Sequence, residues 1–212
     1  MNAVIFDFDG TIADSYDQVL DFLLRRAGRD PATISPDERA TLRASSMKAL
    51  AIMVGIPKWQ LVATYFAGKH YFTKQMHHVS PIPGMDEVLE ALHRENYQLF
   101  VVSSNSRRNI ERFLVERGLS GYFTRTYGNA GWFGKAKTLK KVMKQYKLDP
   151  QKTAYVGDEE RDVAAAHKAG MPSMAVNWGF SSEAALLAHT PTMLIRSPEE
   201  LQKVLVELGR TV

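Results

Sequence analysis

The sequence predicts an α/β protein whose parallel β-sheet is covered by helices and interrupted by one all-helical insert. Residues 3–8, A-V-I-F-D-F, form a short apolar run with β-branched and aromatic members, which is typical of a buried strand. Residues 14–79 show helical periodicity, and from residue 84 onward strand-like and helix-like segments alternate. Repeated β–α units of this length form a doubly wound, Rossmann-like sheet with right-handed crossovers.

The composition is that of an ordinary globular protein. Of the 212 residues, 45% are hydrophobic and 24% are charged, which suits one large core or a core with a smaller companion. The absence of cysteine excludes disulfides, zinc–thiolate sites and cysteine nucleophiles. The first residues lack a basic segment and soon reach Asp7, so they do not resemble a signal peptide, and no apolar run is long enough to span a membrane. We therefore expect a cytoplasmic protein without a membrane partner.

The net charge is +4, and the densest basic run lies at residues 135–147, which hold six lysines. Apolar residues interleave with these lysines at three- and four-residue spacing, so the run predicts an amphipathic helix with a lysine face. A solvated helix face explains this pattern better than a phosphate-backbone footprint, and we expect no nucleic-acid partner. Mild positive charge also attracts small anionic substrates.

Three amphipathic segments follow the first strand. Residues 16–28 carry an apolar stripe with i, i+3, i+4 and i+7 spacing that ends at a glycine, and further helices are predicted over 35–55 and 57–76. Three consecutive helices do not fit a simple β–α alternation. Residues 15–80 are therefore predicted to form a separate helical domain, whose core is expected to include Trp59, Tyr65 and Phe66.

The rest of the chain, residues 81–212, is predicted to join residues 1–14 in the α/β core. The linker P-I-P-G at 81–84 returns the chain from the insert. Helices are predicted between the later strands, because apolar residues there recur at helical spacing. These strands are expected at residues 98–102, 123–127, 153–156, 172–176 and 192–195.

Polar residues follow several of these strands, at the edge where doubly wound sheets bind ligands. Asp7 and Asp9 end the first strand, and period-two geometry turns both carboxylates to the same side. Residues far away in the chain reach the same edge at the ends of later strands. These are Ser103, Lys135, Asp158 and Asp162.

This combination suits phosphoryl transfer. One aspartate can attack phosphorus and form an aspartyl-phosphate, while a second protonates the leaving oxygen and then deprotonates water. Carboxylates suit Mg²⁺, and a lysine with a hydroxyl can neutralise the charge that develops on the phosphoryl group. Taken singly, Asp158 is explained as a helix N-cap, Ser103 as a strand-end hydroxyl and Lys135 as part of the lysine face. Their joint placement favours a site.

The same residues resemble a known family. The segments D-F-D-G-T-I at 7–12, V-V-S-S-N at 101–105, a lysine that opens a helix, and V-G-D-E-E-R-D at 156–162 resemble the four motifs of the haloacid dehalogenase-like (HAD) hydrolases. The segments I-P-G-M near 82 and N-W-G-F near 177 are similar to the phosphoglycolate-phosphatase-like branch. The insert matches the small α-helical cap of that branch in place and size, although not by motif.

The resemblance implies a Mg²⁺-dependent phosphatase that acts on a small phosphorylated metabolite. By resemblance, Asp7 is the nucleophile, Asp9 is the acid/base, and Ser103 and Lys135 hold the phosphoryl group. Relatives often carry K-P-x-P at the lysine motif, where this chain has K-A-K, so Lys137 stays an alternative to Lys135. The resemblance further implies that the metal site uses Asp7, the carbonyl of Asp9, Asp158 and Asp162. Residues expected to bind phosphate or substrate are Gly10, Thr11, Ser104, Asn105 and Arg43.

Related activities differ from this one at single positions. Dehalogenases of the family lack the second acid of the first motif, which is present here as Asp9. Sugar phosphomutases of the branch tend to carry Glu-Asp where this chain has Gly157-Asp158, so hydrolysis is favoured over a mutase activity. A catalytically silent binding or scaffold protein is disfavoured by the complete motif set. The substrate stays open among phosphoglycolate, sugar phosphates and nucleotides, as does the oligomeric state.

Overall fold

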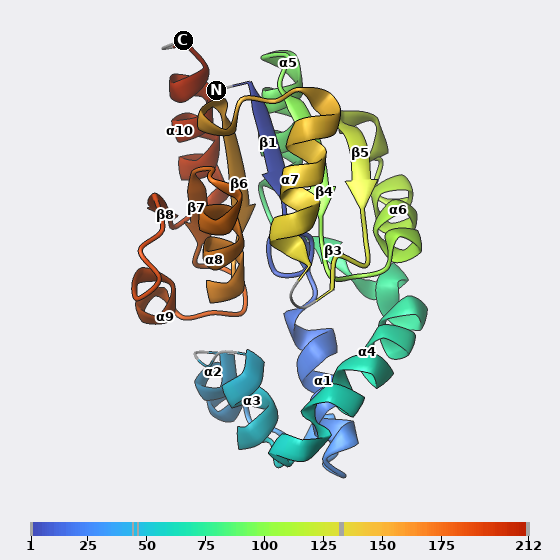
Figure 1. Cartoon of the computed structure of the whole chain (residues 1–212). Coiled ribbons are helices and arrows are strands. Elements are labelled where there is room, and N and C mark those ends of the chain that lie inside the picture. The colour runs from blue at the N-terminus through green and yellow to red at the C-terminus, as the bar shows by residue number, and fades with distance from the viewer. Residues whose placement is uncertain (1, 44, 46, 132–133, 211–212) are drawn as a thin grey trace.

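The computed structural model describes residues 2–43, 45, 47–131 and 134–210. Its main sheet has six parallel strands in the order β5-β4-β1-β6-β7-β8, so the first strand lies among the central ones (Figure 1). The predicted fold class is confirmed, and each predicted strand forms within two residues of its expected range. The strands are β1 (Ala3–Phe6), β4 (Gln98–Val102), β5 (Phe123–Tyr127), β6 (Thr153–Gly157), β7 (Ser173–Val176) and β8 (Met193–Ile195).

Helices cover both faces of the sheet, because successive side chains of each strand point to opposite faces. Val4 and Phe6 pack with apolar residues of α5, α6 and α10, whereas Ile5 packs with those of α7 and α8. In Figure 1, α7 and α8 lie in front of the sheet. The helices are α5 (Met85–Arg94), α6 (Arg107–Glu116), α7 (Lys135–Tyr146), α8 (Glu160–Ala169), α9 (Glu183–Leu187) and α10 (Pro198–Arg210), with short 3₁₀ helices η4 (Ser120–Tyr122) and η5 (Pro150–Lys152).

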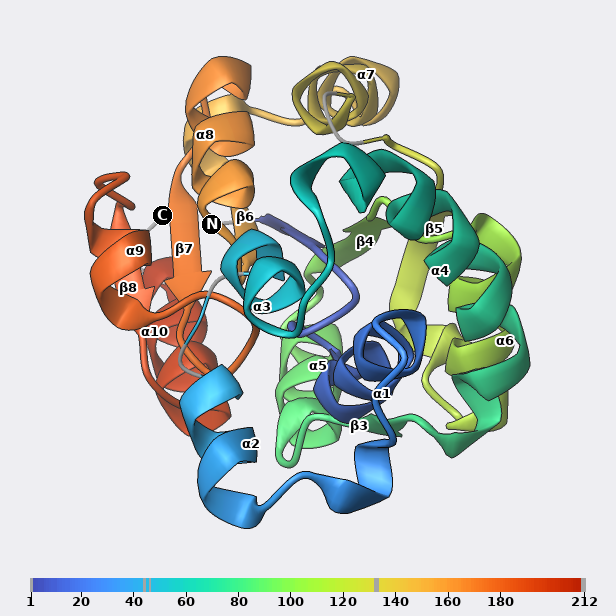
Figure 2. The ribbon, with the colours of Figure 1, turned by 90° about the horizontal axis from the view of Figure 1, so that it is seen from below.

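Residues 15–80, which we call the cap, lie beyond the carboxyl ends of the central strands, at the end of the molecule opposite the two termini (Figures 1 and 2). The chain enters and leaves the cap through β2 (Ala13–Asp14) and β3 (Ser80–Pro81), which pair antiparallel. The predicted domain boundaries fall at this pair, and the division into two domains stays a prediction. The cap contains α1 (Tyr16–Arg26), α2 (Pro36–Arg43), α3 (Met47–Met53) and α4 (Leu61–Gln75), with 3₁₀ helices η1 (Pro31–Thr33), η2 (Lys58–Gln60) and η3 (Met76–His78).

The helix predicted over residues 35–55 is two helices, α2 and α3, so this part of the prediction is wrong. Ser45 lies between them, and its N–H donates to the carbonyl of Leu42 at 3.1 Å in the manner of a helix end. Its hydroxyl donates to the sulfur of Met53 at 3.2 Å. Serine is a weak helix former because its hydroxyl can form hydrogen bonds with nearby backbone groups in non-helical conformations. A serine at this position therefore favours a break between the two helices.

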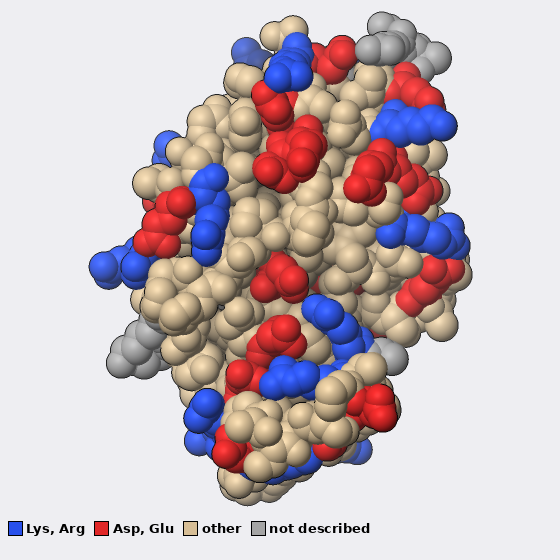
Figure 3. Space-filling model, turned by 180° about the vertical axis from the view of Figure 1, so that it is seen from behind, with Lys and Arg blue, Asp and Glu red and all other residues tan. Residues whose placement is uncertain are grey.

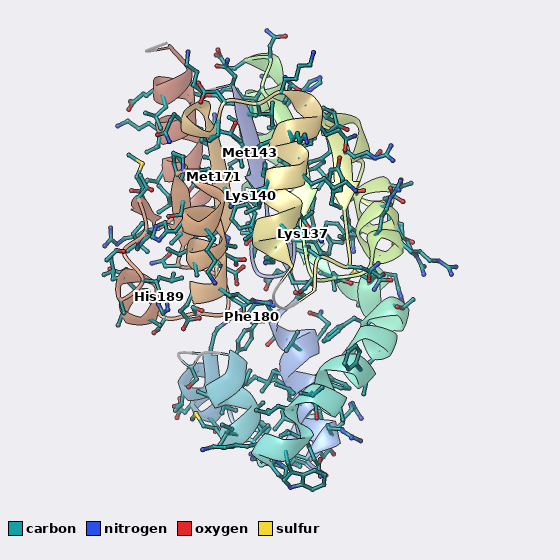
Figure 4. All side chains as sticks on the ribbon, in the orientation of Figure 1. Lys137, Lys140, Met143, Met171, Phe180 and His189 are labelled. Atoms are coloured by element: carbon teal, nitrogen blue, oxygen red, sulfur yellow. The ribbon has the colours of Figure 1, made fainter. Side chains whose placement is uncertain are left out.

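The cap has its own apolar core, and one residue of the α/β core contributes to it. Leu20 and Leu24 of α1 belong to this cluster, as does Phe180 from the segment after β7. Phe180 lies between the cap helices and the core (Figure 4). The prediction that Trp59 and Phe66 lie in the cap core is wrong, since they are 80% and 63% exposed. The side chain of Tyr65 lies outside the described residues.

The charged side chains of two faces of the protein can be compared with the pattern that the sequence predicted. On the face seen from behind, basic and acidic side chains are interspersed, so no large patch of one sign covers it (Figure 3). The lysines of α7 belong to the other face, where Lys137 and Lys140 are exposed as the amphipathic pattern predicts (Figures 1 and 4). Among the described residues, no helix combines the length and hydropathy that a bilayer crossing requires.

Truncation of α7 on its buried side tests the predicted orientation of this helix. Leu139 is fully buried against the sheet, so Leu139→Ala should lower the free energy of unfolding by about 2–5 kcal/mol through lost burial and a residual cavity. The matched change Lys140→Ala, on the exposed side, should stay within about 0.5 kcal/mol of wild type. Urea titration followed by circular dichroism measures both, and equal losses would contradict this orientation.

Candidate active site

The central strands bring distant residues together at their carboxyl ends. Strand β1 lies between β4 and β6 and pairs with both in parallel, so residues that follow the three strands meet at one edge. The backbone N–H of Asp7 donates to the carbonyl of Val156 at 2.8 Å, which fixes Asp7 at the tip of β1 beside β6. Asp158 follows β6 and Ser103 follows β4, and both are buried.

Lys135, the first residue of α7, links two acids of this edge. Its Nζ lies 2.5 Å from Oδ2 of Asp7 and also forms an ion pair with Oδ1 of Asp162. The side chain of Lys135 is only 3% exposed. Burial lowers the pKa of Lys135, but the carboxylates of Asp162 and Asp7 outweigh it, so the pKa lies above its usual value. The charged form of Lys135 is therefore favoured within the acid cluster.

Asp158 is held by the backbone and by one hydroxyl. Thr11 donates its hydroxyl to Oδ1 at 2.7 Å, and the N–H of Phe180 donates to Oδ2 at 2.9 Å. Gly10, with φ at +74°, and Gly179 leave room for the carboxylate, because a Cβ on either residue would overlap it. The N-W-G-F segment at 177–180 therefore supports Asp158 in two ways: Phe180 supplies a hydrogen-bond donor, and Gly179 leaves space for the carboxylate.

Burial raises the pKa of the acids that lie deepest. For Asp158, burial is the main cause, and the carboxylates of Glu159, Asp162 and Asp7 add to it, so its pKa lies well above the usual range. The pKa of Asp7 is also raised by burial and by Asp162, although Lys135 opposes this. Lys135 and the nearby Arg161 both oppose the shift of Asp7 without outweighing burial, so further positive charge would stabilise the ionised acids.

The donor set fits a divalent cation. Carboxylate oxygens of Asp7, Asp158 and Asp162 lie within 4.8 Å of one another, and all three residues are buried. Oδ1 of Asp7 is buried and has no hydrogen-bond partner within the described part of the chain. A buried carboxylate oxygen without a donor is unfavourable unless a cation approaches it. Oxygen donors of this kind suit hard ions such as Mg²⁺.

Asp9 lies beside this cluster in a different environment. It is half-buried, and its carboxylate accepts hydrogen bonds from Nδ2 of Asn105 at 2.9 and 3.2 Å and from the hydroxyl of Ser15 at 3.1 Å. Burial and the charge of Asp7 raise the pKa of Asp9 to about 6, while the bonds from Asn105 and Ser15 oppose the shift. A carboxyl with this pKa can both give and take a proton near neutral pH.

The remaining predicted residues take several positions. Ser103 is 1% exposed, its hydroxyl accepts the N–H of Asn105 at 3.1 Å, and Ser104 next to it is also buried. Lys137 is exposed, whereas Lys135 reaches the acids. Arg43 is found in the cap, with its guanidinium 4.7 Å from the centre of the Tyr16 ring and 3.5 Å from Asp14. The structure thus gathers the predicted core residues and leaves Lys137 and Arg43 without a described contact to the acid cluster.

Two contributors to the site were missed at the sequence level. Tyr155 is fully buried on β6, and its hydroxyl lies 3.1 Å from the carbonyl of Val102 and 3.3 Å from Oδ1 of Asp162, so it helps to place that acid. Asn109 donates to Oδ1 of Asn105 at 3.0 Å and so reaches Asp9 indirectly. Tyr155 reads as an ordinary strand residue, but a buried polar Asn109 on an apolar helix face is a signal that the sequence offered.

Buried acids and a lysine meet at the carboxyl edge of a doubly wound sheet, beside the cap, as in enzymes that transfer phosphoryl groups, and comparison with known proteins identifies the family. Residues 4–176 match the family described as haloacid dehalogenase-like hydrolase. A phosphoglycolate phosphatase of Synechococcus elongatus is 32% identical over 99% of this chain and 100% of its own length. One from Aquifex aeolicus is 26% identical over 97% of each chain. A haloacid dehalogenase-like family protein from Streptococcus pneumoniae has the same fold, with a TM-score of 0.76 at 19% identity over 96% of this chain and 98% of its own.

The chain belongs to the haloacid dehalogenase-like hydrolase family. Within it, the relatives and the motif segments assign the chain to the phosphoglycolate-phosphatase-like branch.

Removal of the buried cation tests the choice of Lys135 over Lys137. Lys135→Met leaves Asp7 and Asp162 without their shared partner, and should lower the free energy of unfolding by about 3–5 kcal/mol near pH 7 without divalent cations. Lys137→Met, at an exposed position, should change it by less than about 0.5 kcal/mol. Denaturant titration in the presence of EDTA measures both variants. A larger loss in Lys137→Met would reverse the assignment.

The raised pKa of Asp9 predicts a pH-dependent stability. Its pKa is about 6 in the folded protein, above the ordinary aspartate value of 3.8, so ionisation opposes folding and stability falls as the pH rises between these values. Asp9→Asn removes this ionisation. The difference in unfolding free energy, Asp9→Asn minus wild type, should therefore become more positive by about 1–3 kcal/mol as the pH rises from 4 to 7.

The comparison is made by denaturant titration without divalent cations. A pH-independent loss of hydrogen bonds in the variant cancels, because only the change with pH is compared. Asp37→Asn, at an exposed position of α2, serves as the control and should show no such increase. A constant difference between Asp9→Asn and wild type across this range would show that burial does not hold the Asp9 proton.

Proposed function

We propose that the protein hydrolyses a small phosphomonoester with Mg²⁺ as its cofactor, through an aspartyl-phosphate on Asp7. The protein is a phosphatase of the haloacid dehalogenase-like family, a class that generally uses a divalent metal. The observation that carries the finer proposal is the meeting of three buried carboxylates and one lysine at the tip of β1.

In the first half-reaction, Asp7 attacks phosphorus and Asp9 protonates the departing oxygen. The Oδ1 atom of Asp7 has no described hydrogen-bond partner, so no donor has to be removed before it reacts or binds the cation. Lys135 lies against Oδ2 of Asp7 and brings positive charge to the position where a phosphoryl oxygen would arrive. The Ser103 hydroxyl accepts the backbone N–H of Asn105 and can donate a hydrogen bond to a phosphoryl oxygen.

In the second half-reaction, Asp9 takes a proton from the water that hydrolyses the aspartyl-phosphate. A pKa of about 6 suits both tasks, because neither the acid nor the base form is rare near neutral pH. Asp7, Asp158 and the carbonyl of Asp9 would hold Mg²⁺, and Asp162 would orient its shell. When bound, the ion supplies positive charge against the oxygens of the phosphoryl group.

The proposed substrate is a small phosphorylated metabolite. Both relatives cited above are phosphoglycolate phosphatases, which makes phosphoglycolate the first candidate, beside sugar phosphates and nucleotides. We propose that the cap closes over the site, excludes water and selects the substrate, with Arg43 as one contact. Gly10, Thr11, Ser104 and Asn105 are proposed to line the phosphate site, although the Thr11 hydroxyl also supports Asp158.

The alternative activities are not favoured. Phosphomutases of this branch place Glu at the position of Gly157, but a Cβ there would lie 2.6 Å from Cβ of Asp162, so the position has no room for a side chain. A silent scaffold has no need for three buried acids within 4.8 Å of one another, because each costs free energy to bury.

Replacement of the nucleophile tests the proposal. Asp7→Asn should keep the circular-dichroism spectrum of wild type and lose Mg²⁺-dependent turnover of p-nitrophenyl phosphate by at least about 10³-fold, since no covalent intermediate can form. Acid quenching during turnover, followed by intact mass measurement, should detect one added phosphoryl group in wild type only. The control Asp86→Asn, at an exposed position of α5, should behave as wild type. Turnover retained in Asp7→Asn would rule out this mechanism.

A further inference from the structure

Asp9 is held by a short chain of side-chain amides that begins inside α6. The amide nitrogen of Asn105 lies 2.9 Å from Oδ2 and 3.2 Å from Oδ1 of Asp9, so one donor spans both oxygens. A carboxylate has about four lone-pair sites. Asn105 therefore leaves positions on Asp9 for a proton or a water molecule, while it fixes the plane of the carboxylate.

The orientation of the Asn105 amide is decided on its other side. Its Oδ1 accepts the backbone N–H of Ser106 at 2.7 Å and Nδ2 of Asn109 at 3.0 Å. A backbone N–H can only donate, so the oxygen of the amide must face α6. The NH₂ group must then face Asp9. Asn109 supplies the second of the two donors that fix this arrangement.

Asn109 is an unusual residue for its position. It is the third residue of α6, is 2% exposed, and lies on the buried side of the helix with Ile110 and Phe113. Asparagine is a poor helix former and an uncommon residue on the buried side of a helix. Its own N–H is accepted by the hydroxyl of Ser106, the N-cap of α6, so the first helical turn fixes its backbone. From this backbone position the buried side-chain amide reaches Asn105.

The other described donor to Asp9 is Ser15, the first residue of the cap. Ser15 immediately precedes α1, and its hydroxyl donates to Oδ1 of Asp9 at 3.1 Å. Without the amide chain, Ser15 would be the remaining described side-chain donor, and the orientation of Asp9 would follow the cap. The amides tie Asp9 instead to the core, next to the nucleophile.

We propose that Asn109 is a positioning residue that acts through Asn105 to hold the Asp9 carboxyl toward the leaving group of the substrate. This inference rests on the proposed role of Asp9 as acid/base. Asn105 contacts the reacting acid, whereas the described hydrogen bond of the Asn109 side chain goes to Asn105, so Asn109 has no direct part in the chemistry.

Two substrates of similar shape separate positioning from general damage. Phenolate is a more basic leaving group than p-nitrophenolate and needs a well-placed acid more. In Asn109→Leu, kcat/KM for phenyl phosphate should fall about 10- to 100-fold, with a much smaller fall for p-nitrophenyl phosphate. Arg108→Ala, exposed beside Asn109, should leave both values unchanged. Equal falls on the two substrates, or no fall on phenyl phosphate, would overturn the inference.

A stability measurement tests the same connection without turnover. The described contacts include none between the side chains of Asn109 and Asp9, so losses of unfolding stability from Asn109→Leu and Asp9→Ala would add if the two residues were independent. Coupling through Asn105 predicts that the double variant loses less than the sum of the single variants. Additive losses would overturn the inference. If Asp7→Asn retained turnover, the proposed mechanism would be wrong. The stability measurement would still show whether Asn109 and Asp9 are coupled, because it does not depend on turnover.

Discussion

A buried ammonium group between two carboxylates is the interaction on which the rest of the site depends. Lys135 meets Asp7 and Asp162 at positions that water barely reaches. Burying charges is unfavourable unless they are paired with good geometry, and here the pairing requires three elements to be in place at once. The strand β1 delivers Asp7, α7 begins with the lysine, and α8 presents Asp162. The lysine still leaves the acids under-compensated, which is why the same geometry suits a divalent cation.

Asp7 and Asp9, the two acids of the first motif, are only two residues apart but lie in different environments. Asp7 is buried against Lys135 and keeps one oxygen without a described donor, whereas Asp9 is half-buried and receives neutral donors. A strand-end pair therefore yields one carboxylate suited to attack and one suited to proton transfer. The cap meets this arrangement at two points, through Ser15 on Asp9 and through the packing of Tyr16 on Phe180, with ring centroids 5.7 Å apart. Because the Phe180 N–H holds Asp158, the packing of the cap and the placement of the buried acids depend on the same residue.

The failures of the sequence prediction have particular causes. The break between α2 and α3 was missed because apolar spacing continues across it, and periodicity does not register a local serine turn. Trp59 and Phe66 were placed inside because large aromatic residues are usually buried, yet the cap core is filled by other residues, including Phe180, which lies more than 100 residues away in the chain. The two-residue strands β2 and β3 were missed because only the meeting of distant segments creates them.

The sequence by itself determined the fold class, the order of the main-sheet strands along the chain and the acids expected at their carboxyl ends, and it left Lys135 and Lys137 as alternatives. Local patterns are enough to predict these features. The spacing of apolar residues within a segment indicates a strand or a helix, and the carboxyl ends of parallel strands meet at one edge of the sheet. Tertiary structure alone decided which partners each group has. It brought Lys135 rather than Lys137 to Asp7, gave the Thr11 hydroxyl to Asp158, and turned the Asn105 amide toward Asp9. Such contacts depend on helix orientation and on the space left by glycines 10 and 179, and both emerge only when distant segments pack together.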